Sequence, residues 1–232
     1  MSKVDTVVPR HLGLILDGNR RWAKEQGLPQ LEGHKKGWEN LKTVGQAALD
    51  RGVEYLSAYV FSTENWKRSQ EEVSYLMKLL IWVCNSEVKE MQRKNIRVVV
   101  LGSREGLSRA VLKAIDKAET ITKDNTGGTL ALCINYGGQL EIADAVKKII
   151  EKRVEKDDVT PVMIEQNLYS ADIPPIDLII RTSGEERLSN FMLWRAAYSE
   201  LMFVDKYWPA FTEQDLEDCF AEYAKRQRRF GS

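Results

Sequence analysis

The chain has 232 residues, of which 43% are hydrophobic and 29% charged, enough for one domain with a sizeable core. Lysine plus arginine number 34, as do aspartate plus glutamate, so overall charge gives no reason to expect a nucleic-acid-binding protein. The cysteines Cys84, Cys133 and Cys219 are too widely spaced for a zinc site or a disulfide framework, so we expect a reducing, cytoplasmic location. We expect neither a signal peptide nor a membrane span, and contact with a membrane surface stays open.

The stretch HLGLILDGNRRWA, residues 11–23, predicts a short buried strand that runs into a helix. The apolar residues 12–16 form the strand, and an aspartate or asparagine then caps the helix. Asp17 would lie at the carboxyl edge of a sheet, where open α/β folds bind ligands. With Arg20 and Arg21 beside free helix-start amides, we expect a diphosphate site in which Mg²⁺ lies between Asp17 and the phosphates. An ordinary strand–helix turn with two solvated arginines would give the same pattern.

The rest of the chain alternates between strand-like apolar runs and segments with apolar residues at helical spacing. We expect five further strands, at 55–61, 96–101, 129–135, 176–180 and 201–204. We expect further helices at 33–51, 69–94, 107–122, 141–153, 160–168, 189–198 and 212–229. This alternation predicts an α/β fold with a mainly parallel sheet, in a single domain over residues 1–232.

The helix expected at 69–94 has two apolar stripes, and Ser69 with Glu72 has the spacing of a capping box at its start. The first stripe consists of Val73, Leu76, Met77, Leu80, Cys84, Val88 and Met91, and the second of Tyr75, Leu79 and Trp82. One stripe is enough to join a core. The second therefore predicts either a cavity lined by this helix, or deeper burial or a dimer contact.

Polar side chains follow several of the predicted strands, namely Asp17, Ser62, Asn65, Asn135 and Arg181. Because parallel strands bring their carboxyl ends to one edge of a sheet, we expect these groups to converge there. Arg187 and Ser189 follow Arg181 closely and would complete a second anion site, although surface salt bridges would also explain the two arginines.

Familiar catalytic signatures are missing from the chain. No phosphate-binding loop of the GxxxxGK[ST] type occurs, and no GxGxxG follows a strand. His11 and His34 are the only histidines, so no Ser–His–Asp or Cys–His arrangement can be argued. We expect His11 to be structural, and His34 either to donate a hydrogen bond to an anion or to cap a helix.

Seven separated motifs point to a known family: HLGLILDGNRRWAK, GHKKG, AYVFSTENWKR, NYGG, IIRTSGEERLSNFMLW, AYSELMF and RRFG. In order and spacing they resemble the cis-prenyltransferase (isoprenyl transferase) family, which includes the undecaprenyl diphosphate synthases. The resemblance implies a six-stranded parallel sheet surrounded by helices, and a homodimer. It also implies Mg²⁺-dependent transfer, in which isopentenyl diphosphate extends an allylic diphosphate, such as geranyl or farnesyl diphosphate, with Z geometry. An apolar tunnel for the growing chain would explain the second stripe of the helix at 69–94.

The resemblance implies roles for individual residues. Asp17 matches the essential aspartate near the allylic diphosphate and metal, and Asn65 matches a residue thought to assist proton removal. The residues that match the allylic substrate site are Gly18, Asn19, Arg20, Arg21, Trp22, Gln30, His34, Ser62, Thr63, Glu64, Trp66 and Arg68. Those that match the isopentenyl diphosphate site are Arg181, Arg187, Leu188 and Ser189. Glu200 matches a second metal-site carboxylate, and Arg229-Phe230-Gly231 matches an element that reaches the partner subunit's site.

Two positions depart from the family pattern. Gln30 stands where many bacterial members have an arginine that grips the allylic diphosphate, and Arg20, often a glycine, could compensate in part. Val60 replaces a smaller residue common in long-chain producers and could favour shorter products. Two other functions stay open: a non-catalytic partner subunit of the same fold, against which Asp17 and Arg181 argue, and a phosphate-binding hydrolase with a Rossmann-like sheet. Product length and the preferred allylic primer are not determined by the sequence.

Overall fold

The computed structural model describes residues 7–226. Within them, six strands form one sheet in the order β3-β4-β2-β1-β5-β6, and every neighbouring pair is parallel. The strands are β1 His11–Ile15, β2 Tyr55–Ser62, β3 Arg97–Leu101, β4 Thr129–Tyr136, β5 Leu178–Thr182 and β6 Glu200–Val204. Each overlaps a predicted strand, so the expected α/β class is confirmed. All eight residues of β4 are buried, as expected for a parallel sheet covered on both faces.

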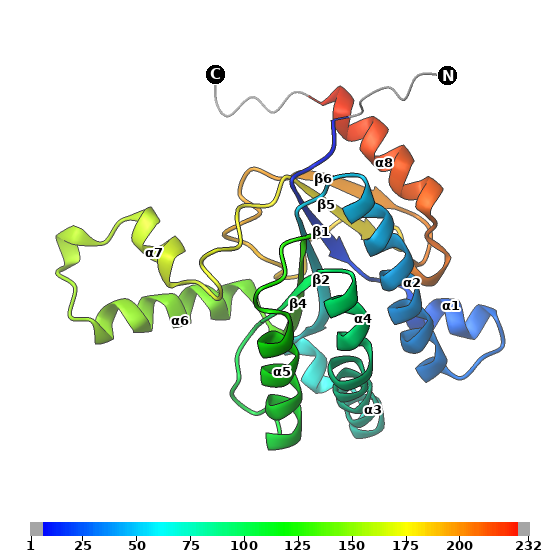
Figure 1. Cartoon of the computed structure of the whole chain (residues 1–232), viewed down its shortest axis with the longest axis horizontal. Helices are drawn as coiled ribbons and strands as arrows, with labels where there is room; N and C mark the ends of the chain where they lie inside the picture. Colours follow the sequence, from blue (N-terminus) through cyan, green and yellow to red (C-terminus); the bar gives the residue numbers. More distant parts are fainter. Residues whose placement is uncertain (1–6, 227–232) are drawn as a thin grey trace.

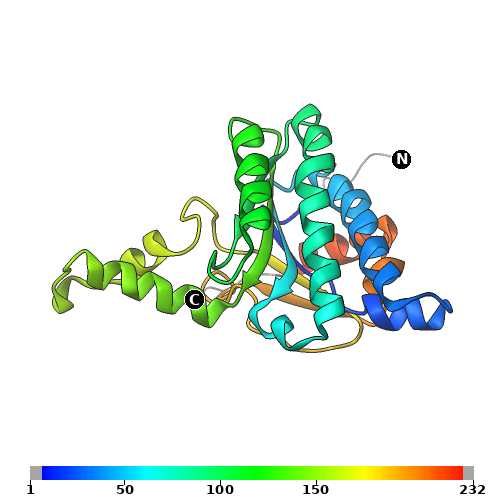
Figure 2. The ribbon, with the colours of Figure 1, turned by 90° about the horizontal axis from the view of Figure 1, so that it is seen from below.

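Eight α-helices surround the sheet within the described residues (Figure 1). They are α1 Asn19–Glu25, α2 Gln30–Asp50, α3 Gln70–Trp82, α4 Val88–Arg93, α5 Arg109–Thr122, α6 Gly138–Glu151, α7 Pro161–Asn167 and α8 Glu213–Lys225. The main core packs apolar side chains of α2, α3, α4, α5 and α8 against one face of the sheet. The opposite face is covered by the irregular segments 169–176 and 188–196. Helices α6 and α7 pack on each other and project from the body as an arm, seen at the left of Figure 1 and Figure 2.

The helix predicted at 69–94 is divided in the structure. A π turn, Val83–Glu87, separates α3 from α4. All residues of the first predicted stripe are buried except Met77, which is partly buried. In the second stripe, Trp82 is 44% exposed. Ser69 caps α3 by accepting a hydrogen bond from the Glu72 amide at 3.3 Å, as predicted, whereas the Glu72 carboxylate makes other contacts, described below.

The prediction of a helix at 189–198 is wrong. Ser189, Asn190 and Met192 have φ angles of 48°, 67° and 40°, in the left-handed region that a right-handed helix excludes. The turns in this segment instead bury Phe191 and Met192 completely under the sheet. The segment is held by Arg195, which is also buried.

Arg195 forms a buried ion pair with Glu141 of α6 at 2.8 Å. Its guanidinium also donates to the carbonyl oxygens of Ile173, at 3.1 Å, and Tyr169, at 2.7 Å. Because the charges and donors are paired inside the protein, this cluster ties the two irregular segments to each other and to α6.

Thr212 caps α8 and shares a capping box with Asp215, as the start predicted at 212 implies. The helix ends at Lys225, earlier than the predicted 229, and Arg229-Phe230-Gly231 lie outside the described residues.

The three cysteines are buried and free, in line with the absence of a disulfide framework. No helix in the 7–226 range is both long and apolar enough to cross a bilayer.

Candidate active site

Asp17 lies two residues beyond the end of β1, at the carboxyl edge of the sheet. Thr182, at the end of β5, fixes its backbone: the Asp17 amide donates to Thr182 Oγ1 at 3.1 Å, and that hydroxyl donates to the Asp17 carbonyl at 2.8 Å. The next residue, Gly18, has a φ of 97°, and a Cβ there would come within 2.6 Å of the Tyr207 ring. The turn therefore needs glycine, and it lets the Gly18 amide donate to Asp17 Oδ1 at 2.7 Å.

Arg181, in β5, reaches the same carboxylate from the neighbouring strand. Its Nη2 donates to Asp17 Oδ2 at 2.8 Å and its Nη1 to Ser189 Oγ at 2.7 Å. The side chain is 4% exposed, and its Nε has no hydrogen-bond partner within residues 7–226. Arg21 adds a second contact, from Nη2 to Asp17 Oδ1 at 3.2 Å. A buried guanidinium with an unused donor can take a further acceptor, such as a phosphate oxygen.

The charges around Asp17 favour its ionised form. Partial burial disfavours the carboxylate, but the hydrogen bond and charge of Arg181, the Gly18 amide and the charge of Arg21 outweigh it. Together they hold the pKa of Asp17 below its ordinary value. Asp17 is therefore an anion at neutral pH, balanced by two arginines.

On another side of the site, Glu72 of α3 accepts hydrogen bonds from three nitrogen-bearing side chains. Its Oε2 accepts from Arg20 at 3.2 Å, and its Oε1 accepts from Arg68 at 2.8 Å and from His34 Nε2 at 3.1 Å. Burial opposes ionisation of Glu72, but the charges of Arg68 and Arg20 and the contact with His34 lower its pKa. Burial lowers the pKa of His34 despite Glu72, so its imidazole is neutral at pH 7 and donates from Nε2.

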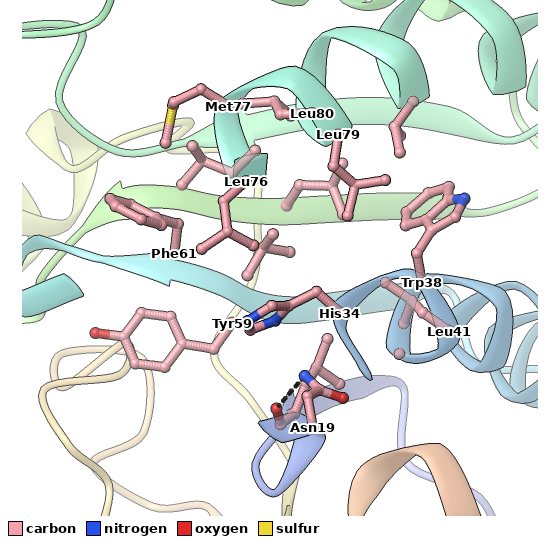
Figure 3. A pocket seen from close by; sticks show the side chains of 16 residues that line it. Asn19, His34, Trp38, Leu41, Tyr59, Phe61, Leu76, Met77, Leu79 and Leu80 are labelled. Atoms are coloured by element: carbon pink, nitrogen blue, oxygen red, sulfur yellow. Dashed lines mark hydrogen bonds between the residues drawn. The ribbon is translucent and has the colours of Figure 1, made fainter. Parts of the chain in front are cut away.

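These walls enclose a polar cleft of about 550 Å³. Its lining includes most of the predicted polar residues: Asp17, Asn19, His34, Ser62, Glu64, Asn65, Arg68, Arg181 and Ser189. An apolar cavity of about 70 Å³ adjoins the cleft and is lined mainly by α2, β2 and α3 (Figure 3). The two spaces share Leu16, Asn19, His34, Tyr59 and Val60. The site therefore combines a charged mouth with an apolar interior.

The residues of the FSTENW motif take partly structural roles. Asn65 lies in a 3₁₀ turn, Thr63–Lys67, where its Oδ1 accepts from the Ser62 amide at 3.2 Å. Trp66 Nε1 donates to Asn135 Oδ1 at 2.7 Å, and its ring packs edge-on against Phe61. Asn65 lines the cleft. Trp66 does not line the cleft, but it packs against Phe61 and Asn135 beside it.

Several predicted site residues lie outside the cleft lining. They are Gly18, Arg20, Arg21, Trp22, Gln30, Thr63, Trp66, Arg187, Leu188 and Glu200. Gln30 is exposed at the first position of α2. Arg187 contributes its carbonyl oxygen to Arg181, while its side chain pairs with Glu185 at 2.5 Å.

Glu200 does not converge with Asp17 within one chain. Glu200 is the first residue of β6 and pairs with Leu178, the first residue of β5. Asp17 lies beyond the last residue of β1, Ile15, which pairs with Arg181 near the other end of β5. The two carboxylates therefore lie towards opposite edges of the sheet, and Glu200 pairs with Arg226 at 3.0 Å. Strand register therefore separates Asp17 from Glu200 within one chain, and the metal role of Glu200 stays a prediction.

The described residues contain no cluster of three or more His, Cys, Asp or Glu side chains able to hold a metal alone. Mg²⁺ often binds through one or two carboxylates together with substrate phosphates. Asp17, ionised and lining the cleft, suits that kind of site.

Sequence reasoning missed three residues at this site. It assigned Glu72 to a helix cap, and nothing in its spacing indicated the contacts with Arg20 and His34. Tyr59 lines both spaces, and its hydroxyl is 3.2 Å from the carbonyl oxygens of Tyr136 and Ser189. Asn190 lines the cleft and donates to Glu64 at 3.1 Å. The alternation of β2 could have indicated Tyr59, but the turn that positions Asn190 has no sequence signal.

A parallel α/β sheet whose carboxyl edge carries an aspartate and arginines beside an apolar cavity is suited to a ligand with an anionic head and an apolar tail. The sequence model described as "Putative undecaprenyl diphosphate synthase" matches residues 15–231, and the chain belongs to this family.

Individual proteins that are similar to this chain support the same family assignment. The chain is 47% identical over 226 residues to the isoprenyl transferase of Thermotoga maritima, covering 97% of each chain. It is 43% identical over 228 residues to a Micrococcus luteus protein, covering 97% of this chain and 92% of the other. That protein is named ditrans,polycis-undecaprenyl-diphosphate synthase ((2E,6E)-farnesyl-diphosphate specific). The structure of lavandulyl diphosphate synthase from Lavandula x intermedia, in complex with dimethylallyl diphosphate, superposes with a TM-score of 0.92. That pair is 35% identical and covers 97% of this chain and 99% of the other.

Proposed function

We propose that this protein condenses isopentenyl diphosphate onto an allylic prenyl diphosphate with Z geometry, using Mg²⁺, and that it works as a homodimer. The observation that carries the proposal is the junction of two unlike spaces. Asp17 and Arg181 meet at 2.8 Å in a cleft that adjoins an apolar cavity. A substrate with a diphosphate head and an isoprenoid tail matches both environments.

The proposed reaction breaks the bond between carbon 1 of the allylic substrate and its diphosphate oxygen. The isopentenyl double bond attacks that carbon, a new carbon–carbon bond forms, and carbon 2 of the isopentenyl unit loses a proton. Negative charge grows on the leaving diphosphate, so preorganised cationic donors lower the barrier. The apolar cavity shields the allylic centre from water.

The chain's residues suit these steps. Arg21, His34 and Arg68 lie where they can hold the allylic diphosphate, and Arg181 with Ser189 can hold the isopentenyl diphosphate. In this arrangement incoming phosphate oxygens replace Asp17 as the partner of Arg21 and Arg181. Asn65 and the diphosphate of the isopentenyl substrate are the proposed acceptors on the route of the lost proton.

Asp17 is the residue that would hold Mg²⁺, together with substrate phosphate oxygens. When bound, the ion neutralises charge on the departing diphosphate. Glu200 would serve a metal only if a second chain brings its β6 edge to this cleft, which is one reason to propose a homodimer. Arg229-Phe230-Gly231 remains a proposed contribution to the partner's site.

The proposed role of Asp17 is tested with Asp17→Ala. We expect kcat for isopentenyl transfer to fall about a thousandfold, because the group that balances the site's cations and would hold the ion is lost. Transfer of radiolabelled isopentenyl diphosphate measures this, and circular dichroism checks the fold. Asp124→Ala, at an exposed loop position, is the control. Near-normal transfer by Asp17→Ala would refute the assignment.

Arg181→Ala tests the second anion site. Since Arg181 offers charge-assisted bonds to one substrate, KM for isopentenyl diphosphate should rise about 10- to 100-fold, and more than KM for the allylic substrate. Steady-state kinetics with each substrate varied in turn gives both values. Arg109→Ala, at an exposed position of α5, should change neither, and an unchanged isopentenyl KM in Arg181→Ala would contradict the role.

A further inference from the structure

A second apolar space lies beyond the cavity described above. It has a volume of about 30 Å³ and is lined by residues of α2, β2, α4 and β4 and their connections. The two spaces share two residues of α2, Trp38 and Leu41. In Figure 3 these two side chains lie at one end of the first cavity, and Tyr59 and Phe61 lie at the other. Trp38 is not among the residues that the cavity shares with the cleft, so it lies on the side of the cavity that faces the second space.

The Trp38 side chain fills this position by its bulk rather than by hydrogen bonding. It is only 8% exposed, and its Nε1 has no hydrogen-bond partner among the described residues. A buried donor without a partner is unfavourable, and a smaller apolar side chain would avoid that penalty. The large indole ring therefore contributes shape, and its shape separates the two spaces.

The space in front of Trp38 is small. Its volume of about 70 Å³ is below the roughly 150 Å³ of an engineered cavity that holds one benzene ring. An isoprene unit has five carbons, so this space accepts only the end of a prenyl tail. A tail that extends past the first cavity must displace the indole of Trp38.

We propose that Trp38 forms the floor of the tail cavity and limits the length of the prenyl product. The proposal rests on the proposed function, since it concerns the tail of that product. With the indole removed, the first cavity opens into the second. The second space is also lined by Lys42, Glu90 and Lys94, whose charges oppose further entry of an apolar chain. The product should therefore lengthen by a limited number of units.

The test compares products of the wild-type protein and Trp38→Ala. Each purified full-length protein receives farnesyl diphosphate, excess isopentenyl diphosphate and Mg²⁺, and mass spectrometry gives the chain lengths after dephosphorylation. We expect the main product of Trp38→Ala to be longer by one or more five-carbon units. Trp38→Phe keeps an aromatic floor without the N–H and should keep the wild-type length. If Trp38→Ala does not fold, Trp38→Met makes the same comparison.

Leu49→Ala is the matched control, since Leu49 lines the second space but not the first. It enlarges the second space and leaves the floor intact, so product length should not change. An unchanged product distribution in the folded floor variant would overturn the proposal, as would equal lengthening in Leu49→Ala. A wild-type protein that forms no prenyl product would instead refute the proposed function.

Discussion

At the wall of the cleft, two oxygens of one buried carboxylate organise three side chains from different elements. Glu72 holds Arg20 of α1, His34 of α2 and Arg68, which follows the 3₁₀ turn. Without that carboxylate the two guanidinium groups repel each other, and the hydrogen bonds that orient them are lost. Glu72 therefore positions His34 and Arg68, two of the groups that the proposed mechanism places on the allylic diphosphate.

Glu72→Gln tests this positioning role. It keeps the shape of the side chain and removes its charge, so we expect KM for the allylic diphosphate to rise about tenfold, with a smaller change in KM for isopentenyl diphosphate. Glu71→Gln, at the exposed neighbouring position, should leave both values unchanged. Equal effects on both substrates would point to a general structural role.

His11 has a purely structural environment, as the sequence predicted. It is fully buried at the start of β1, its Nδ1 donates to the Pro174 carbonyl at 2.8 Å, and its Nε2 lies 2.8 Å from Ser57 Oγ. Burial lowers the pKa of His11 to about 4 from an ordinary value of 6.5. The unfolded chain then binds a proton at higher pH than the folded protein, so His11 makes the free energy of unfolding fall as the pH drops from 6.5 to 4.

The total loss attributable to His11 is about 3 kcal/mol over that range. Urea unfolding of wild type and His11→Gln at several pH values from 7 to 4 measures it. The variant should be less stable at pH 7 and should show a shallower decline between pH 6.5 and 4. Contributions from His34 are present in both proteins and cancel in the comparison. Parallel curves would contradict the assignment.

Individual site residues were predictable where a strand end or a family motif marks them. Asp17, Ser62 and Arg181 lie at strand ends, and the structure brings them to one cleft. Residues that act through long-range contacts were not predictable. Glu72 satisfies a local capping pattern equally well, and its true partners are 4 to 52 residues away in the chain.

The α3–α4 run shows how one element adapts to two neighbours. Its π turn contains Asn85, whose Nδ2 donates to the Ile81 carbonyl at 2.9 Å while its Oδ1 accepts from Lys117 Nζ of α5 at 2.9 Å. The π-helix is rare and occurs mostly as single turns inside α-helices. This turn follows directly on the part of α3 that lines the apolar cavity.

Asn85→Ala should lower the free energy of unfolding by about 1 kcal/mol, because both hydrogen bonds are lost. Urea denaturation followed by circular dichroism measures the change. Ser86→Ala, at an exposed position in the same turn, should change the free energy of unfolding by much less. A loss as large in Ser86→Ala would show that helix propensity, rather than the Asn85 contacts, determines the stability of this turn.

The sequence could predict helices with regular spacing but not these irregular elements. The pattern of 69–94 is continuous through the π turn, because the apolar stripe continues across it with Cys84 and Val88 buried. The segment 188–196 has an apolar pattern that suits a helix. Its left-handed residues and the Glu141–Arg195 pair instead hold it as turns, and both depend on tertiary contacts.

For the molecule as a whole, the alternation of strands and helices predicted the parallel sheet, but it did not predict the strand order. Nor did it predict the arm formed by α6 and α7. Val146 and Ile150, one turn apart on α6, are 40% and 68% exposed, and Val162 on α7 is 59% exposed. This apolar surface is suited to contact with a second copy in the proposed homodimer.

Ile150→Asp should weaken the homodimer, since a charge placed in an apolar interface loses its water. Sedimentation velocity across a concentration series should show at least a tenfold higher dissociation constant. Ile121→Asp, on the exposed face of α5, is the matched control and should leave the dissociation constant unchanged. A wild-type protein that is monomeric throughout the series would refute the homodimer, and equal behaviour of the two variants would exclude the arm as its interface.

The central claim is that the cleft and the apolar cavity together perform prenyl transfer. The most direct test incubates the purified wild-type protein alone with farnesyl or geranyl diphosphate, labelled isopentenyl diphosphate and Mg²⁺, and determines product length and double-bond geometry. We expect prenyl diphosphates extended by isopentenyl units with new Z double bonds. Release of phosphate without carbon–carbon bond formation, or no reaction with either primer, would contradict the account.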